Sequence, residues 1–319
     1  MALTDRLICS KLLVLAVRRI AVIFCLGLLT SALSAQEGIY DWDDSKTLAR
    51  GIQYVRVKPT QPNKIVINCL RIDSQVPDIR FHATGRCRDW TEGKEETRRK
   101  SVRNFIRESR MTNRKLVVAT NADAFSPWPV PYQKETLTDV LGLLVSDGTL
   151  VSRGSGTPSF VVSKDGNLSI TTTVADTSEA NIETAVSGFA LCLIDGQVPA
   201  SGNDLHPRTG LGLSADRRFV LMMTIDGRQA ASAGATTQTV GNWLKHFGAH
   251  NGINMDGGGS TTMAWWDALE SEDDKCVLLN HPVGRGSSRG IFGPTERANG
   301  SNLGVYLMEE NHVGDGLEN

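Results

Sequence analysis

The residues best suited to chemistry surround three successive glycines at positions 257–259. Asp256 provides a carboxylate just before this run, Asn254 stands two positions earlier, and Ser260 and Thr261 follow with hydroxyl groups. Three glycines in a row cost conformational entropy on folding, but they let backbone amides approach a ligand closely and form an anion-binding nest. No lysine follows in the Walker position, so the run is not a P-loop. The alternative interpretation is a plain glycine turn between two strands.

Residues 254–263 resemble the signature Asn-x-Asp-Gly-Gly-Gly-Ser-[Ser/Thr]-Thr-Met of the phosphodiester glycosidase family. Other segments resemble motifs of this family in its order: residues 206–212 its Pro-Arg-Thr segment, 224–228 its Val-Asp-Gly-Arg turn, and 295–297 with 302–305 its Glu-Arg…Asn-x-Leu-x-Val ending. This ordered set covers roughly residues 115–307 and is more specific than any single motif. The family includes enzymes that remove N-acetylglucosamine from mannose 6-phosphate signals, and bacterial exopolysaccharide-associated proteins.

One motif departs from the commonest family pattern. Residues 121–125 read Asn-Ala-Asp-Ala-Phe, where many members carry Asn-Gly-Gly followed by two aromatic residues. The change places the carboxylate of Asp123 where those members have glycine, and it removes one aromatic ring. It leaves the sugar specificity open more than it affects the expected fold.

The resemblance implies hydrolysis of a sugar-1-phosphodiester, and the residue types suit that reaction. A phosphate monoester is a good leaving group because its second pKa is about 6. Binding the phosphate therefore matters more than protonating it, and arginine binds phosphate with a planar fork. A carboxylate must then stabilise or attack the oxocarbenium-like centre, or activate water.

We expect two groups of site residues on this basis. The candidate catalytic carboxylates are, in order of preference, Asp256, Asp226, Glu296 and Asp123. The candidate substrate-binding residues are Asn121, Arg208, Thr209, Arg228, Asn254, Gly257, Gly258, Gly259, Ser260, Thr261, Arg297 and Asn302. The sequence does not assign the nucleophile or the acid/base, because that needs distances between carboxyl groups. It also leaves the sugar, the anomer and the second alcohol open.

Several residues have a simpler alternative role. Asp226 with its following glycine could be a hairpin turn, and Glu296 with Arg297 a surface ion pair. Two rival functions also remain. One is a non-catalytic carbohydrate-binding protein on the same fold. The other is a metal-dependent phosphodiesterase in which Asp123, Asp226 and Asp256 hold a divalent cation. The histidines show no metal-ligand spacing, and we expect neither a metal nor a cofactor.

The elements that must position these residues are mainly short strands. Alternating or apolar runs between turn residues predict strands at 51–57, 64–72, 115–120, 141–145, 159–163, 168–172, 190–194, 211–213, 219–225, 260–266 and 302–307. Apolar residues at helical spacing predict a surface helix at 97–109 and a core helix at 236–247, capped by Thr236 or Thr237. The pattern favours one α+β domain at 51–310, with a mixed or antiparallel sheet and a few packed helices. Residues 36–50 and 267–300 read as irregular, and 311–319 as a disordered tail.

The N-terminus predicts export. Arg18 and Arg19 precede an apolar run at 20–29 and small residues up to Ala35, which is typical of a secretory signal at 1–35. The run is too short for a comfortable membrane span, although an uncleaved signal anchor is the alternative. The net charge of -1 indicates neither a nucleic-acid partner nor attraction to a membrane surface. The expected partner is a carbohydrate phosphodiester, and the oligomeric state is open.

Four cysteines follow the signal segment: Cys69, Cys87, Cys192 and Cys276. In an exported chain they permit two disulfides in three pairings, and Cys69 with Cys87 is the first guess because they are close in sequence. The alternative is that all four are buried free thiols.

Overall fold

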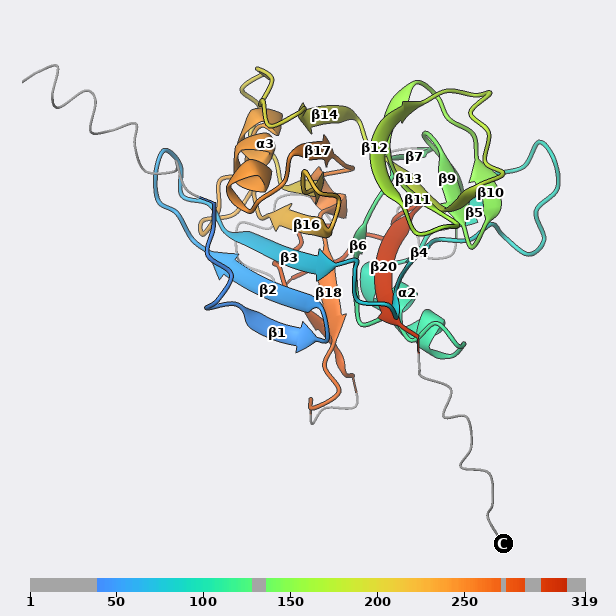
Figure 1. Cartoon of the computed structure of the whole chain (residues 1–319), viewed down its shortest axis with the longest axis horizontal. Helices are drawn as coiled ribbons and strands as arrows, with labels where there is room; N and C mark the ends of the chain where they lie inside the picture. Colours follow the sequence, from blue (N-terminus) through green and yellow to red (C-terminus); the bar gives the residue numbers. More distant parts are fainter. Residues whose placement is uncertain (1–38, 128–135, 271–273, 285–293, 309–319) are drawn as a thin grey trace, which may run out of the picture. The chain divides into compact units, whose positions relative to one another are not determined.

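The computed structural model describes residues 39–127, 136–270, 274–284 and 294–308 (Figure 1). Residues Tyr40–Asn319 form one compact unit. The predicted signal segment at 1–35 and the predicted tail at 311–319 lie outside the described residues. None of the helices in the described ranges is long and apolar enough to cross a membrane.

The fold is mostly β, which corrects the expected α+β class. Strands make up 42% and helices 9% of the structure. The described residues contain two α-helices, α2 (Val102–Arg110) and α3 (Thr237–His246), and one short 3-10 helix, η1 (Gly258–Ser260). The reason lies in the sequence, whose many short apolar runs pair with one another and leave few segments long enough to form helices.

Four antiparallel sheets hold the strands. The largest has the order β1 (Lys46–Ala49), β2 (Ile52–Val57), β3 (Ile67–Asp73), β16 (Phe219–Ile225), β15 (Arg208–Leu213), β17 (Asn251–Asn254) and β14 (Ala190–Leu193). A five-stranded sheet has the order β19 (Cys276–Leu278), β18 (Met263–Trp266), β6 (Val118–Asn121), β20 (Asn302–Leu307) and β4 (Ile79–Ala83). Another has the order β10 (Thr149–Ser152), β9 (Leu144–Ser146), β13 (Ile182–Ser187), β11 (Thr157–Ser163) and β12 (Leu168–Thr173). The smallest has the order β5 (Thr97–Arg98), β8 (Leu137–Val140) and β7 (Phe125–Ser126).

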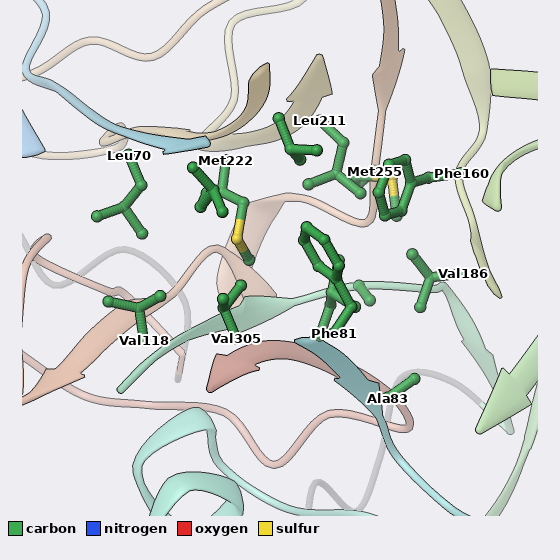
Figure 2. Packing of buried hydrophobic residues seen from close by; sticks show 14 of the residues in the cluster. Leu70, Phe81, Ala83, Val118, Phe160, Val186, Leu211, Met222, Met255 and Val305 are labelled. Carbon is green, nitrogen blue, oxygen red and sulfur yellow. The ribbon is translucent and has the colours of Figure 1, made fainter. Parts of the chain in front are cut away.

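The main core lies where the three larger sheets face one another. Figure 2 shows its buried side chains converging from all three sheets. Residues shown there include Leu70, Leu211 and Met222 from the seven-stranded sheet, Phe81, Val118 and Val305 from the β4–β6–β20 sheet, and Phe160 and Val186 from the β11–β13 sheet. Met255 belongs to the same core, directly before Asp256. Close packing of such a core resists displacement, so it fixes the place where the glycine run begins.

Both helices form where an apolar stripe follows a capping hydroxyl. Thr236 caps α3 by accepting a hydrogen bond from the backbone N–H of Thr239 at 3.0 Å. Val240 and Leu244 of α3 are buried against β14, β15 and β17, as expected for the predicted core helix. Helix α2 begins later than predicted, because Thr97–Arg98 forms β5 and Ser101 provides the cap.

The structure contains strands that the sequence pattern did not predict. Residues expected to be irregular form β1, and the nearby Trp42 is buried with its indole N–H donating to the carbonyl of Phe247 at 3.2 Å. The expected loop at 267–300 includes β19. Residues 260–262 do not extend β18, because the glycine run turns into η1 first. Edge strands as short as these have too few residues to show a clear alternation.

All four cysteines in the compact unit are free thiols. Cys69 lies in β3 with its side chain buried in the core that packs under α3, whereas Cys87 lies in a loop and is half-buried. The expected Cys69–Cys87 disulfide is therefore not formed in this structure, and the alternative of free thiols describes it better. Burial of Cys69, Cys192 and Cys276 raises the pKa of each thiol.

Candidate functional site

One cavity of about 410 Å³ gathers the glycine run and the expected arginines. Its polar lining and the glycine run comprise His206, Arg208, Arg228, Asp256, Gly257, Gly258, Gly259 and Arg297. Its apolar lining comprises Ala124, Phe125, Leu141 and Phe189. Three guanidinium groups and one carboxylate give the cavity a net positive charge, which suits an anionic ligand.

Antiparallel pairing explains why residues so far apart in sequence meet here. Arg208 begins β15 and pairs with Ile225, the last residue of β16, while Gly210 pairs with Asn254, the last residue of β17. The start of β15 and the ends of β16 and β17 therefore lie at the same edge of the seven-stranded sheet. The loops leaving that edge carry Arg228 and Asp256. Arg297 is supplied from the segment that precedes β20.

Asn121 joins three segments behind the cavity. Its side-chain oxygen accepts hydrogen bonds from the hydroxyl of Thr209 at 2.8 Å and the backbone N–H of Thr262 at 3.1 Å. Its amide group donates to the backbone carbonyl of Asp256 at 2.7 Å. Asn121 and Thr209 are buried and do not line the cavity. Both were expected to bind substrate, and the structure instead places them as supports of the glycine run.

The three glycines allow two close approaches. Gly258 has φ of +62°, and its N–H donates to the carbonyl of Pro207 at 2.8 Å, which docks the run onto the segment before β15. At Gly259 a Cβ atom would lie 2.3 Å from Nη2 of Arg297. Gly259 therefore admits the side chain of Arg297 against its own backbone, and a Cβ atom at this position would displace that guanidinium group.

Asp256 is the only acidic side chain among the described residues that line this cavity. Its carboxylate accepts hydrogen bonds from the backbone N–H of Gly257 at 2.9 Å and from the side chain of Ser260. Burial raises the pKa of Asp256 to about 6, while these hydrogen bonds and the charge of Arg297 oppose the shift. An acid with such a pKa exchanges protons readily near neutral pH, as a base or nucleophile requires.

Backbone carbonyl groups and a hydroxyl group help to orient two of the arginines. Arg208 donates from Nε to the carbonyl of Ala235 at 2.9 Å and from Nη2 to the carbonyl of Asp204 at 3.1 Å. Arg297 is buried and donates from Nη1 to the hydroxyl of Ser260 at 3.3 Å. Bonds to carbonyl oxygens orient the guanidinium group of Arg208 without neutralising it. Arg297 also interacts with the charge of Asp256, whose pKa it lowers.

Two of the candidate carboxylates, Asp226 and Glu296, bind other protein groups outside the cavity. Asp226 is buried and accepts from the side chain of Asn280 at 3.0 Å and the backbone N–H of His281 at 3.1 Å. Glu296 forms an ion pair with Arg103 of α2, with 2.5 Å between Nε and Oε2. Neither lines the cavity. The structure therefore does not bring these two expected catalytic carboxylates to the cavity with Asp256.

The third, Asp123, is buried behind the cavity. It accepts from the backbone N–H of Ser187 at 2.5 Å and from the hydroxyl of Ser301 at 2.7 Å. It does not line the cavity either. Because Ser187 precedes Gly188 and Phe189, this carboxylate fixes the segment that carries an aromatic wall of the cavity.

The remaining expected binding residues also lie behind the cavity surface. Asn254, Ser260, Thr261 and Asn302 are all buried and absent from the lining. Ser260 connects two lining residues, because its hydroxyl forms hydrogen bonds with both Arg297 and Asp256. Asn302 donates to the carbonyl of Lys100 at 3.3 Å and joins β20 to the β5 segment. These residues shape the site without presenting groups to a ligand.

The sequence interpretation missed five lining residues, one of which is the small Ala124. His206 stands two positions before Arg208, a spacing that places both side chains on one face of an extended segment and could have revealed it. Phe125 lies at the end of the Asn-Ala-Asp-Ala-Phe motif. Leu141 and Phe189 are 47% and 57% exposed, yet they lie far apart in sequence and no local pattern connects them. Together these apolar residues provide a surface for a ring or an apolar group beside the cationic wall.

A larger cavity of about 750 Å³ lies beside α2, but none of the residues of the glycine run or of the expected site lines it. Arg98 pairs with Asp89, and Lys100 with Glu108. The described residues also contain no group of three or more His, Cys, Asp or Glu side chains that could hold a metal ion. The 410 Å³ cavity is therefore the better candidate for chemistry.

The buried Asp123 makes a testable contribution to stability. Burial raises its pKa from 3.8 to about 8, so the folded protein binds this proton more tightly than the unfolded chain. The stability that the protonated acid contributes is complete below about pH 4 and is lost as the pH rises through 8. Asp123→Asn, which does not titrate, should therefore melt at a higher temperature than the parent at pH 9, and this gain should shrink at pH 5.

Melting curves at both pH values check this prediction, and turnover checks the role of Asp123. Asn can still accept from Ser187 and donate to Ser301, so the variant should keep its activity. A variant that melts lower at both pH values would contradict the stability argument. A variant that folds normally but is inactive would return Asp123 to the catalytic group.

Comparison with known proteins provides independent findings. The sequence pattern of the phosphodiester glycosidase family matches residues 114–306. No curated protein matches the sequence significantly. Among solved structures, the catalytic domain of zebrafish N-acetylglucosamine-1-phosphodiester alpha-N-acetylglucosaminidase, auto-inhibited by its pro-peptide, superposes with a TM-score of 0.60 at 18% identity, over 85% of this chain and 87% of that chain.

Two bacterial structures are also similar. A hypothetical protein from Synechocystis has a TM-score of 0.54 at 11% identity, over 82% of this chain and 63% of that one. A protein from Burkholderia pseudomallei, described as exported, has a TM-score of 0.51 at 13% identity, over 76% and 74% of the two chains. At these identities the superpositions show a shared fold, and the match to the family pattern is the stronger finding.

Proposed function

Because this chain belongs to the phosphodiester glycosidase family, we propose that it hydrolyses the bond between the anomeric carbon of a sugar and the oxygen of a phosphodiester. The observation that carries the proposal is that one cavity presents three guanidinium groups together with a single carboxylate, Asp256. An anion clamp next to a carboxylate with a pKa of about 6 suits this reaction better than it suits simple carbohydrate binding.

The arginines bind the phosphate in this proposal. Arg208, Arg228 and Arg297 reach the cavity from three different segments, so three guanidinium groups are available to the phosphate. Charge-assisted hydrogen bonds from guanidinium groups are strong and directional. As the leaving phosphate gains negative charge, the same contacts strengthen, which lowers the barrier to its departure.

Asp256 acts at the sugar. The bond between C1 and the phosphate oxygen breaks, and its electron pair leaves with the phosphate, which departs as a monoester. The oxygen of water forms the new bond at C1, either directly with Asp256 accepting the proton of water, or after Asp256 has first attacked C1 as the nucleophile. Both routes require ionised Asp256, so activity should depend on its deprotonation.

The apolar wall suits the rest of the substrate. Phe189, which is exposed, can stack on the apolar face of a sugar ring, and Leu141 extends this surface. We place the enzyme in an exported glycan or polysaccharide context. The basic and apolar N-terminal pattern supports this, as does the fold shared with a protein described as exported. Anchoring by an uncleaved signal segment remains the alternative.

Hydrolysis in water enriched in oxygen-18 tests the proposed reaction. The protein would be incubated with a panel of sugar-1-phosphodiesters carrying a nitrophenyl or nucleoside group, and the products analysed by mass spectrometry. The proposal expects the label in the hydroxyl at C1 of the released sugar, because the C1–O bond breaks. Label in the phosphate would mean that a P–O bond breaks, which would refute the glycosidase proposal.

The same assay separates the rival functions. A metal-dependent phosphodiesterase would lose activity in EDTA and would label the phosphate. Neither is expected here, because Asp123 and Asp226 direct their oxygens to protein donors rather than toward Asp256. A binding protein would retain the ligands of the panel without releasing any sugar.

A further inference from the structure

His206 is held in place at the cavity by its backbone. Its N–H donates to the carbonyl of Ala235 at 3.2 Å, and its own carbonyl accepts from the N–H of Ala235 at 2.9 Å. Arg208, two residues later, also donates to that carbonyl of Ala235. The side chains of His206 and Arg208 both line the cavity. The segment is thus a fixed strap that presents two polar side chains to the same space.

Two glycines bring neighbouring backbone into close contact with this strap. A Cβ atom at Gly234, which has φ of +103°, would lie 2.8 Å from the carbonyl carbon of His206. A Cβ atom at Gly227 would lie 2.7 Å from the nitrogen of Pro207. The residue after Gly227 is Arg228, whose φ of +58° is unfavourable for a residue with a side chain. Such strain persists only where the surroundings impose it, and here it aims Arg228 at His206.

The contact between the two side chains fixes the proton on the imidazole ring. Nη2 of Arg228 lies 3.1 Å from Nδ1 of His206. A guanidinium group can only donate hydrogen bonds, so Nδ1 must be the acceptor and carry no proton. The neutral ring then carries its proton on Nε2, which leaves one N–H group to donate to a ligand.

We infer that His206 binds the phosphate of the substrate as a neutral donor through its Nε2–H, with Arg228 holding the required tautomer. This inference rests on the proposed function for the identity of the anion as a phosphodiester. His206 would join the three arginines as a fourth side chain that binds the phosphate. Arg228 would then both bind the phosphate and hold the tautomer of His206. His206 differs from the arginines because its donor depends on a protonation state that its neighbours maintain.

The charged groups around His206 favour the neutral ring. Burial lowers its pKa, and the charges of Arg228 and Arg208 lower it further, while Asp204 opposes them. The other charged side chains of the cavity are Asp256 and Arg297. A protonated ring would place an N–H at Nδ1 against the N–H groups of Arg228, and their hydrogen bond would be lost. The ordered clamp therefore requires His206 to be neutral.

Three variants test the role by kinetics. His206→Gln keeps an acceptor for Arg228 and a donor for the phosphate, so kcat/KM should stay within several-fold of the parent. His206→Phe keeps an aromatic ring without either group, and kcat/KM should fall roughly 10- to 100-fold, the usual effect of losing a hydrogen bond to a charged group. His250→Gln, outside this cavity, is the matched control and should behave as the parent. Unchanged kcat/KM in His206→Phe would overturn the inference.

The dependence of kcat/KM on pH at acid pH distinguishes this role from a purely structural one. In the parent, both Asp256 and His206 must lose a proton, so log kcat/KM should approach a slope of two at low pH. In His206→Gln only Asp256 titrates, and the slope should become one. A slope that stays the same in the parent and in His206→Gln would contradict the requirement for neutral His206.

Two measurements on the full chain need no turnover. Two-bond ¹H–¹⁵N correlation spectra should show His206 as the Nε2–H tautomer in the parent and as a mixture in Arg228→Leu. Titration with inorganic phosphate should show binding about 10- to 100-fold weaker in His206→Phe than in the parent. The Nδ1–H tautomer, or equal phosphate binding, would overturn the inference. If both results hold but no sugar phosphodiester is cleaved, the proposed reaction fails and the phosphate site stands.

Discussion

Replacing Asp256 with Asn should abolish turnover while leaving the protein folded. The change removes the only acidic group among the described residues lining the cavity, yet it keeps the size of the side chain and an oxygen that can accept from Gly257. No neighbouring carboxylate can take over, because Asp226 and Glu296 are bound to other partners. Loss of a nucleophile or general base lowers kcat by about 10³-fold or more.

The measurement is kcat on the best substrate of the panel, with melting temperature as the check of folding. Asp195→Asn is a matched control, since Asp195 lies in an exposed turn with φ of +47°, a conformation that Asn tolerates. It should match the parent in both measurements. An Asp256→Asn variant with near-normal kcat would remove Asp256 from the mechanism, whereas one that fails to fold calls for Asp256→Ser as the second variant.

The stereochemistry of the parent reaction separates the two possible tasks of Asp256. Retention of the anomeric configuration in the first-formed sugar would identify Asp256 as the nucleophile, and inversion would identify it as the base that activates water. In either case kcat/KM of the parent should rise with pH as Asp256, with its pKa of about 6, becomes ionised. Proton NMR of the product within the first minutes reads the anomer directly.

Gly259→Ala should weaken the binding of the phosphate by displacing Arg297, although Gly259 itself has no functional group. The new Cβ atom would lie 2.3 Å from Nη2 and 2.7 Å from Cζ of Arg297. The guanidinium group is the end of a flexible side chain, so it should move away while the backbone stays in place. Because a displaced donor no longer meets the departing phosphate, kcat/KM should fall by about 10²-fold or more with a small change in melting temperature.

A double-mutant cycle makes this prediction specific. If Gly259→Ala acts through Arg297, then adding it to Arg297→Ala should cause little further loss, because the affected group is already absent. Gly202→Ala is the control, since a Cβ atom there would have no neighbour within 4 Å. Equal losses from Gly259→Ala with and without Arg297 would show that the glycine acts by another route.

Much of the fold followed from local pattern. The strand at 302–307 and the two hairpins at 159–172 and 211–225 were predicted from alternation and turn residues, and the structure confirms them as β20, β11–β12 and β15–β16. Helix α3 was predicted from one apolar stripe and a capping threonine. The pattern missed β1 and β19, since a few residues at a sheet edge carry little periodic signal. It also missed the six-residue β13 inside its sheet, and the balance of helix to strand.

For the site, the sequence by itself determined the family and most of the polar residues that line the cavity, with His206 as the exception. The order of the motifs along the chain indicated the family, and the glycine run pointed to Asp256 as the catalytic candidate. These features are local, because a backbone that must admit a guanidinium group or an anion requires glycine at fixed positions along the chain.

Only the tertiary structure decided which of those residues face a ligand. Asp226 and Asp256 are alike in sequence, since each precedes glycine, but Asp226 is bound to Asn280 and His281 while Asp256 opens onto the cavity. Glu296 and Arg297 are neighbours that point to different partners, one to α2 and one to the site. The physical reason is that the fate of a charged group depends on burial and on partners brought close by folding, and neither is written in the residues next to it.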